Sequence, residues 1–366
     1  MTMSMWGAIV TAVLILSSAS VLLVAAHLHS FPFLKKLAGK SRLLSWLAAV
    51  AMVLPIGLFA FVNTATMLIV LIHFAIGFLF CDLVFFIIGR IAHKKVSKTV
   101  RNLTAIILTS VYLAVGWFMA NHIFVTRYSL ETSKDVGSIR IAQIADAHIG
   151  ATLDGTSLSR QIERINSYKP DVLVITGDFV DDDTTYDDMV ASCRALGEAQ
   201  TTYGVYYVFG NHDKGYYDSR NFTVKQLKDE LSGNGVVVLE DKSVLIDGRF
   251  YIIGRQDRSA RNRAAMADLV SDLDENKYSI VLDHQPNDYE NEASAGVDLV
   301  LSGHTHGGHI FPAGIIGLLS GANDREYGTE VRGKTTFVVT SGISGWAIPI
   351  KTGCYSEFVI IDVNQI

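Results

Sequence analysis

Four apolar stretches dominate the first third of this 366-residue chain. Each reaches the roughly 20 residues that an α-helix needs to cross the hydrocarbon core of a bilayer. The second stretch contains Pro55 and Gly57, which predict a kink that neighbouring helices can accommodate. The stretches are residues 5–26, 43–62, 65–88 and 103–125. They predict an α-helical membrane region of four spans within residues 1–127.

Lys and Arg are unevenly distributed between these stretches. Residues 27–42 carry four of them and residues 89–102 carry five, whereas residues 63–64 carry none. Because loops rich in Lys and Arg are retained in the cytoplasm, both basic loops are expected there. With four spans, this orientation predicts a multi-pass protein of the cell membrane whose residues after Arg127 lie outside the cytoplasm. One span fewer would move those residues to the other side.

Histidines past residue 127 occur only inside short clusters of Asp, Asn and Gly. The chain has 11 histidines, and six of them lie in this part. Together the clusters supply enough nitrogen and oxygen ligands for two divalent metal ions and leave one histidine for proton transfer. The clusters are Asp146-Ala147-His148, Gly177-Asp178, Gly210-Asn211-His212-Asp213, Asp283-His284 and Gly303-His304-Thr305-His306-Gly307-Gly308-His309.

Apolar, β-branched runs lead directly into these clusters. Residues 139–145, 172–176, 205–209 and 299–302 have the composition of buried strands. Segments with helical patterning lie between several of them, at 157–168, 187–199, 222–231 and 260–274. Alternating strands and helices predict an α/β sheet, and such sheets bind ligands at the carboxyl ends of their strands. Every cluster is expected at that edge.

The order of the five clusters resembles the calcineurin-like metallophosphoesterase superfamily, whose motif series is D-x-H, G-D, G-N-H-[ED], H and G-H-x-H. The resemblance covers about residues 138–361. It implies a β-sandwich flanked by helices and a hydrolase that uses two divalent ions, Mn, Fe or Zn, to cleave phosphoester or pyrophosphate bonds. The S-G-H-T-H-G-G sequence at 302–308 is similar to a bacterial membrane-associated branch that includes UDP-diacylglucosamine pyrophosphatase-like proteins.

The resemblance also implies a role for each cluster. The first metal would be held by Asp146, His148, Asp178 and His306, and the second by Asp178, Asn211, His284 and His304. Asp178 would then bridge the two ions, and a hydroxide between them would attack phosphorus. His212 would protonate the leaving group, with Asp213 as its orienting partner. His309 is expected behind the ligands or facing the substrate.

Charge divides the chain in the same place as hydropathy. Ten of the 31 Lys and Arg residues lie in residues 1–127, but only one of the 36 acidic residues, Asp82, lies there. The remainder is strongly acidic, which argues against a nucleic-acid partner because phosphate backbones are bound through clustered Lys and Arg. Asp82 is expected to reach Arg90 or His93. Four arginines within 255–263 are interpreted as a solvated helix face rather than a substrate clamp.

These observations predict a membrane region at 1–127, a connector at 128–137 and a metallophosphoesterase domain at 138–366. The predicted function is a membrane-anchored phosphohydrolase acting on a phosphorylated small molecule or lipid. One alternative is a cytoplasmic-facing UDP-2,3-diacylglucosamine pyrophosphatase, and another is a sensor or scaffold that binds a phosphorylated ligand without turnover. The apolar stretches 311–319 and 346–350 are compatible with lipid contact, although core packing is the favoured interpretation.

Overall fold

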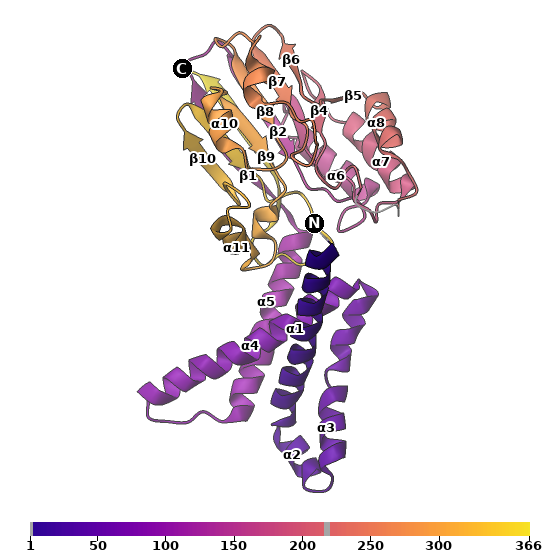
Figure 1. Cartoon of the computed structure of the whole chain (residues 1–366), viewed down its shortest axis with the longest axis vertical. Helices are drawn as coiled ribbons and strands as arrows, with labels where there is room; N and C mark the ends of the chain where they lie inside the picture. The colour runs from indigo at the N-terminus through magenta and orange to yellow at the C-terminus, as the bar shows by residue number, and fades with distance from the viewer. Residues whose placement is uncertain (1–2, 216–219) are drawn as a thin grey trace. The chain divides into compact units, whose positions relative to one another are not determined.

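The computed structural model describes residues 3–215 and 220–366 (Figure 1). The chain divides into two compact units, Met1–Val115 and Gly116–Ile366. The first unit is helical. Its helices are α1 (Met3–His29), α2 (Pro32–Ala38), α3 (Arg42–Ala51), the 3-10 helix η1 (Leu54–Phe61), α4 (Thr64–Ile91) and most of α5 (Lys98–Asn121).

Three helical segments of the described residues are long and apolar enough to cross a membrane: Arg42–Phe61, Thr64–Ile91 and Lys98–Asn121. A further candidate consists of Leu14–His29 and Pro32–Ala38, which are bent by 90° relative to one another. Counting this bent pair as one span gives four, so the predicted number of spans stays a prediction. Within the first segment, α-helix ends at Ala51 and a 3-10 helix begins one residue before Pro55. Proline lacks the N–H that a continuing α-helix requires.

Asp82 of α4 pairs with residues of two other helices. Its Oδ1 lies 2.8 Å from Nη1 of Arg101, and its Oδ2 lies 3.1 Å from Nε2 of His27. The expectation of Arg90 or His93 as partner was therefore wrong. Sequence distance along one helix suggested those two residues, whereas helix packing brings α1 and α5 to the carboxylate. A charge in an apolar helix needs such partners because its desolvation is costly.

The second unit contains two mixed six-stranded sheets among the described residues. Their strand orders are β1-β12-β2-β3-β4-β5 and β10-β11-β9-β8-β7-β6. The first sheet comprises β1 (Ile123–Thr132), β2 (Ser138–Ile144), β3 (Val172–Thr176), β4 (Val205–Val208), β5 (Val236–Val238) and β12 (Ser356–Gln365). The second comprises β6 (Lys242–Ile246), β7 (Phe250–Gly254), β8 (Tyr278–Leu282), β9 (Leu299–Ser302), β10 (Gly328–Arg332) and β11 (Thr335–Val339).

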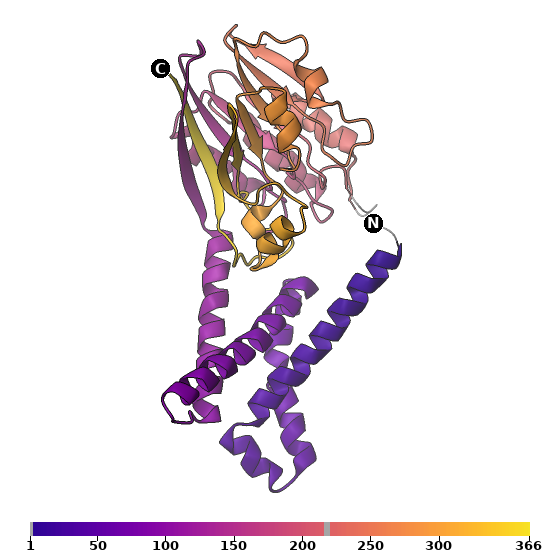
Figure 2. The ribbon, with the colours of Figure 1, turned by 60° about the vertical axis from the view of Figure 1, so that its left-hand side comes forward.

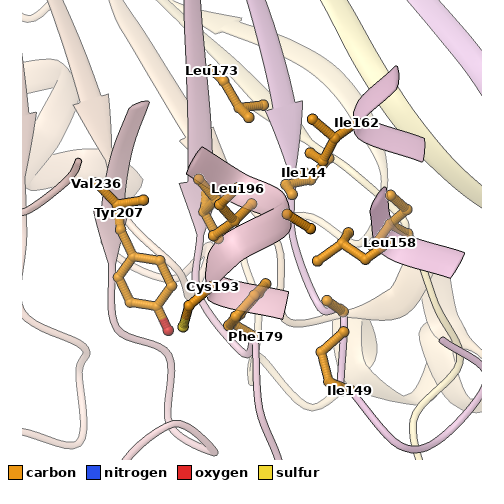
Figure 3. Close-up of a cluster of buried hydrophobic side chains, with 14 of the residues drawn as sticks. Ile144, Ile149, Leu158, Ile162, Leu173, Phe179, Cys193, Leu196, Tyr207 and Val236 are labelled. Atoms are coloured by element: carbon orange, nitrogen blue, oxygen red, sulfur yellow. The ribbon is translucent and has the colours of Figure 1, made fainter. Parts of the chain in front are cut away.

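The two sheets pack face to face, and helices cover their outer faces. Alternate residues of each strand, such as Ile141 of β2 and Ile280 of β8, form the core between the sheets. The outer face of the first sheet is covered by α6 (Gly155–Asn166), α7 (Tyr186–Gly197) and α8 (Val224–Gly233). In Figure 3, Leu158 of α6 and Leu196 of α7 pack toward Ile144 of β2. The shorter helices α9 (Met266–Val270) and α10 (Tyr289–Ser294) cover the second sheet.

This arrangement is the α/β architecture that the sequence predicted. Strands β2, β3, β4 and β9 coincide with the predicted apolar runs, and β8 supplies the segment before His284. Because both faces of these strands are covered, they are mostly apolar rather than strictly alternating; β2, which carries Arg140 and Gln143, departs most from this pattern. The predicted helix at 260–274 is shorter than expected, since α9 begins only at Met266.

Strand β1 differs from the prediction. It pairs in parallel with β12 from Ile123 to Thr132 and forms the edge of the first sheet (Figure 2). The sequence analysis placed residues 123–125 in the last span and 128–137 in a connector. An edge strand has a neighbour on one side only, so exposed polar positions alternate with Tyr128 and Leu130, which contact the core. Only His122 separates α5 from β1.

Helix α11 (Ala313–Leu319) is also unlike the prediction. The sequence analysis favoured core packing for 311–319, but no residue of α11 is buried. Its apolar side chains are exposed, with Ile316 at 61% and Leu319 at 83%.

Candidate metal centre

All five polar clusters follow the carboxyl ends of strands. Asp146 and His148 follow β2, Asp178 follows β3, and Asn211 and His212 follow β4. From the second sheet, His284 follows β8, and His304 and His306 follow β9. The structure brings these loops together at one edge of the sandwich. There the described side chains form three groups with the spacing of metal ligands. Two of them consist of predicted ligands, and the third consists of His148, Asp181 and His212.

The first group consists of Asp146, His148 and His306. One potential ligand atom from each residue lies within 4.8 Å of the others, and all three side chains are buried. Nε2 of His148 lies 3.1 Å from Nε2 of His306, which in turn lies 3.9 Å from Oδ1 of Asp146. Asp178 approaches this group as well, with its Oδ2 3.8 Å from Nε2 of His148.

The second group consists of Asp178, His284 and His304, again within 4.8 Å of one another. Nε2 of His284 lies 3.0 Å from Oδ2 of Asp178 and 3.2 Å from Oδ1 of Asn211. Asp178 is therefore the carboxylate shared by both groups. From this place Asp178 could contribute an oxygen ligand to a cation in either group.

The hydrogen bonds around the histidines fit divalent metals. Nδ1 of His284 lies 2.8 Å from the carbonyl oxygen of Thr176, which can only accept, so Nδ1 carries a proton. Nε2 is then the nitrogen that would bind a metal, and it faces two oxygen atoms, of Asp178 and Asn211. His148 is held in the same way, because its Nδ1 donates to Oδ2 of Asp181 at 3.0 Å. Outer hydrogen bonds of this kind orient imidazoles toward metals.

The charges of the group also favour a cation. Burial alone would lower the pKa of His284, but Asp178 and Asp146 outweigh it and raise that pKa well above its usual value. Burial, together with the neighbouring Asp178, raises the pKa of Asp146 to about 6. Without a metal, protons are thus held between these groups. A divalent ion would displace them, as is usual when ligands must be deprotonated.

The backbone at the ligands is unusual. Asp146, His148, Asp178, His304 and His306 all have positive φ, between 37° and 71°. Such conformations are uncommon for residues with a Cβ and concentrate at functional sites. Neighbouring Gly210 and Gly303 allow the close approach: a Cβ would lie 2.2 Å from Oδ1 of Asp178 at Gly210 and 2.6 Å from Oδ2 of Asp146 at Gly303.

His212 lies beside the two groups and pairs with Asp181. Its Nδ1 is 2.9 Å from Oδ1 of Asp181, whose other oxygen accepts from His148. Burial lowers the pKa of His212, but the hydrogen bond to Asp181 and the nearby carboxylates outweigh it and raise that pKa. The ring also lies 5.5 Å from that of Trp346. His212 is thus positioned to hold a proton next to the ligand cluster.

Comparison with known proteins agrees with this geometry. The model of the calcineurin-like phosphoesterase family matches residues 139–308. A metallophosphoesterase of Aquifex aeolicus is 31% identical over 248 residues, which cover 66% of this chain and 91% of the relative.

The chain belongs to the calcineurin-like metallophosphoesterases.

Other relatives extend beyond the aligned region. A metallophosphoesterase of Campylobacter jejuni is 31% identical over 231 residues, 62% of this chain and 59% of the relative. A bovine protein described as a transmembrane protein with a metallophosphoesterase domain is 27% identical over 237 residues, 61% of this chain and 52% of the relative. The chain therefore matches only somewhat more than half the length of these two metallophosphoesterases.

Asp181 is the residue of this metallophosphoesterase that the sequence analysis missed. It opens a run of three aspartates, Asp181 to Asp183, and such runs are usually solvated turns. The available signal was its position just after the Gly177-Asp178 cluster, which places it at the same edge of the sheet. Its carboxylate connects His148 of the first group to His212.

Asp213 performs a different task from the one expected. Its buried carboxylate accepts hydrogen bonds from four backbone N–H groups at 2.7–3.0 Å: those of Asp178, Phe179, Val180 and Gly210. It therefore fixes the two loops that carry Asp178 and Asn211, while the ring of His212 pairs with Asp181. His309 lies behind the ligands, with its ring 5.4 Å from that of His306. Burial, with Lys351 nearby, lowers the pKa of His309 to about 3, so its ring is neutral.

The arginines at 255–263 do not form a solvated helix face. Arg255 is buried, and its guanidinium contacts Asp283 and Glu292 at 3.0 Å and Asp288 at 2.8 Å. Arg263 also pairs with Asp283, the residue before His284. The interpretation was wrong for these two residues because their partners come from the segment after β8. The network holds the segment that carries a predicted metal ligand.

Proposed function

We propose that this metallophosphoesterase is a membrane-anchored, metal-dependent phosphohydrolase that cleaves a phosphoester or pyrophosphate bond. The observation that carries the proposal is the pair of ligand groups that share Asp178. The apolar helices and the bovine transmembrane relative support attachment to a membrane.

The side chains of the site fall into metal ligands and a proton donor. Asp146, His148 and His306 would hold one divalent ion, and Asn211, His284 and His304 the other, with Asp178 between them. When bound, two divalent ions polarise the phosphoryl oxygens and make a water nucleophilic near neutral pH. Asp181 accepts the Nδ1 hydrogen of His212, which leaves the Nε2 proton of His212 available for the leaving group.

The first prediction tests whether the protein is an enzyme. Purified full-length protein is expected to hydrolyse bis(4-nitrophenyl) phosphate or 4-nitrophenyl phosphate with Mn²⁺, because no ligand position of the two groups is lost. Chelation should abolish this activity, and Mn²⁺, Fe²⁺ or Zn²⁺ should restore it. A protein that carries two metals but hydrolyses neither these esters nor a pyrophosphate would instead be the sensor or scaffold.

The second prediction concerns the side of the membrane. The basic loops at 27–42 and 89–102 favour an extracytoplasmic catalytic domain. A cysteine introduced at the exposed Ser133 should therefore react with a membrane-impermeant thiol reagent in intact cells whose outer wall is permeabilised. The unsubstituted chain is the control, since Cys81 and Cys193 are buried and Cys354 is partly so. Protection until the inner membrane is broken would favour the cytoplasmic UDP-2,3-diacylglucosamine pyrophosphatase.

A further inference from the structure

We propose that an apolar rim beside the metal centre rests in the bilayer, and that the site acts on an amphiphile whose alkyl chains stay in the membrane. The proposal rests on the phosphohydrolase function above and names its substrate class. The rim consists of Phe311, Ile315, Ile316, Leu318, Leu319 and Trp346.

The apolar side chains of the rim are largely exposed to solvent. Phe311 is 57% exposed, Leu319 is 83% exposed, and Trp346, on a separate loop, is 45% exposed. Residues 310–322 contain no charged side chain. Single exposed apolar residues are common on soluble proteins, but several on one short uncharged segment, as at 311–319, mark a contact with an apolar partner.

The rim is joined to the metal centre by short contacts. The carbonyl oxygen of His309 accepts hydrogen bonds from the N–H groups of Thr352 and Gly353, both at 2.9 Å, and His309 stacks on His306. The N–H of Phe311 donates to Oγ1 of Thr352 at 3.0 Å. The ring of Trp346, on a separate loop, lies 5.5 Å from that of His212. A group held by the rim is therefore beside both the predicted ligands and the predicted proton donor.

The loop at 349–352 is joined to the last two turns of α5, which belong to the second unit. The N–H of Lys351 donates to the carbonyl oxygen of Gly116 at 2.9 Å, and Nδ2 of Asn121 donates to the carbonyl oxygen of Pro349 at 3.4 Å. A Cβ at Gly116 would lie 2.9 Å from Cγ2 of Ile350, so helix and loop are in close contact. Trp117 and Phe118, in the last two turns of α5, are 56% and 48% exposed.

These contacts support the bilayer as the partner of the rim. Helix α5 is long and apolar enough to span a membrane, and its last two turns are bonded to the loop that also anchors Phe311. The rim thus begins where a predicted span ends. Apolar side chains at such a position are stabilised by contact with acyl chains. A lipid could then present its phosphate to the metal centre without leaving the membrane.

Two substrates with the same reacting group test the proposal. Methyl 4-nitrophenyl phosphate and hexadecyl 4-nitrophenyl phosphate share the leaving group and differ in the alkyl chain. With full-length protein in phosphatidylcholine nanodiscs, Ile316→Ser combined with Leu319→Ser should lower the hexadecyl-to-methyl ratio of kcat/KM by about tenfold or more. Val331→Ser is the matched control, because Val331 is an exposed residue of β10 outside the rim, and should leave the ratio unchanged.

A second measurement is independent of catalysis. An environment-sensitive fluorophore on Leu319→Cys, in a chain with Cys354→Ser, should shift to shorter wavelength and be quenched by brominated acyl chains in nanodiscs, whereas a fluorophore on Val331→Cys should not. Equal behaviour of the two labels, or an unchanged ratio in the rim variant, would overturn the proposal. A shift that appears in detergent and depends on protein concentration would identify a second copy as the partner instead. Failure to hydrolyse either ester would count against the phosphohydrolase function, while the label would still report on the rim.

Discussion

Asp178→Asn is expected to abolish turnover while leaving the fold largely intact. The carboxylate lies 3.0 Å from Nε2 of His284 and 3.8 Å from Nε2 of His148, so both predicted metals depend on it. A neutral amide cannot neutralise the charge of two cations. We expect kcat with bis(4-nitrophenyl) phosphate at saturating Mn²⁺ to fall by roughly 10³-fold or more. Metal analysis of the purified variant should show the loss of at least one ion.

Asp183→Asn provides a matched control for this variant. Asp183 is an exposed aspartate in the loop that follows Asp178, so its replacement should leave both turnover and metal content close to those of the unchanged protein. Near-normal activity of Asp178→Asn with saturating Mn²⁺ would show that the assignment of two bridged metals is wrong. Thermal unfolding of both variants would establish that a loss of activity does not reflect a loss of fold.

His212→Ala should lower kcat by about 10²–10⁴-fold, the range usual for a general acid, with metal content nearly unchanged. The reason is the position of His212, whose Nδ1 pairs with Asp181 beside the two groups of predicted ligands. Because His148, Asp181 and His212 also have the spacing of metal ligands, the metal content of the variant decides between the two roles. The loss should be smaller for a nitrophenyl ester than for an alkyl ester, because nitrophenolate leaves without a proton. Loss of a bound metal in this variant would make His212 a ligand and contradict the proposed role.

The variant Asp181→Asn tests whether Asp181 acts in catalysis by positioning His212 or by a direct role of its own. Because Asp181 acts through the ring of His212, adding Asp181→Asn to His212→Ala should cost much less activity than Asp181→Asn does alone. Asp181 also accepts from His148, so metal affinity is measured in parallel. Full additivity of the two replacements would show that they act separately.

Features encoded locally were predicted from the sequence. Strands β2, β3, β4 and β9 follow from apolar runs that end in short polar clusters. The order of those clusters carried the resemblance that implied the family and its β-sandwich. Burial on both faces makes such strands continuously apolar, and this pattern is visible without any knowledge of neighbours. The same clusters contain the residues that the structure places in the two ligand groups.

Features that depend on contacts with distant segments of the chain were not predicted from the sequence. Strand β1 was read as a connector because its polar positions make sense only once β12 is known to cover one side. Arg255 was read as a solvated residue because its carboxylate partners lie 28 to 37 positions further along the chain. The apolar run in α11 gave no indication of whether it would be covered.

The sequence by itself determined which side chains can bind metal and which strands deliver them, because these properties lie within a few consecutive residues. The family resemblance already implied that Asp178 is shared. Only the tertiary structure decided that Asp181 contacts both His148 and His212, and that α11 stays exposed. These outcomes depend on strand order and loop packing. Both are set by contacts between segments far apart in the chain, which no local pattern records.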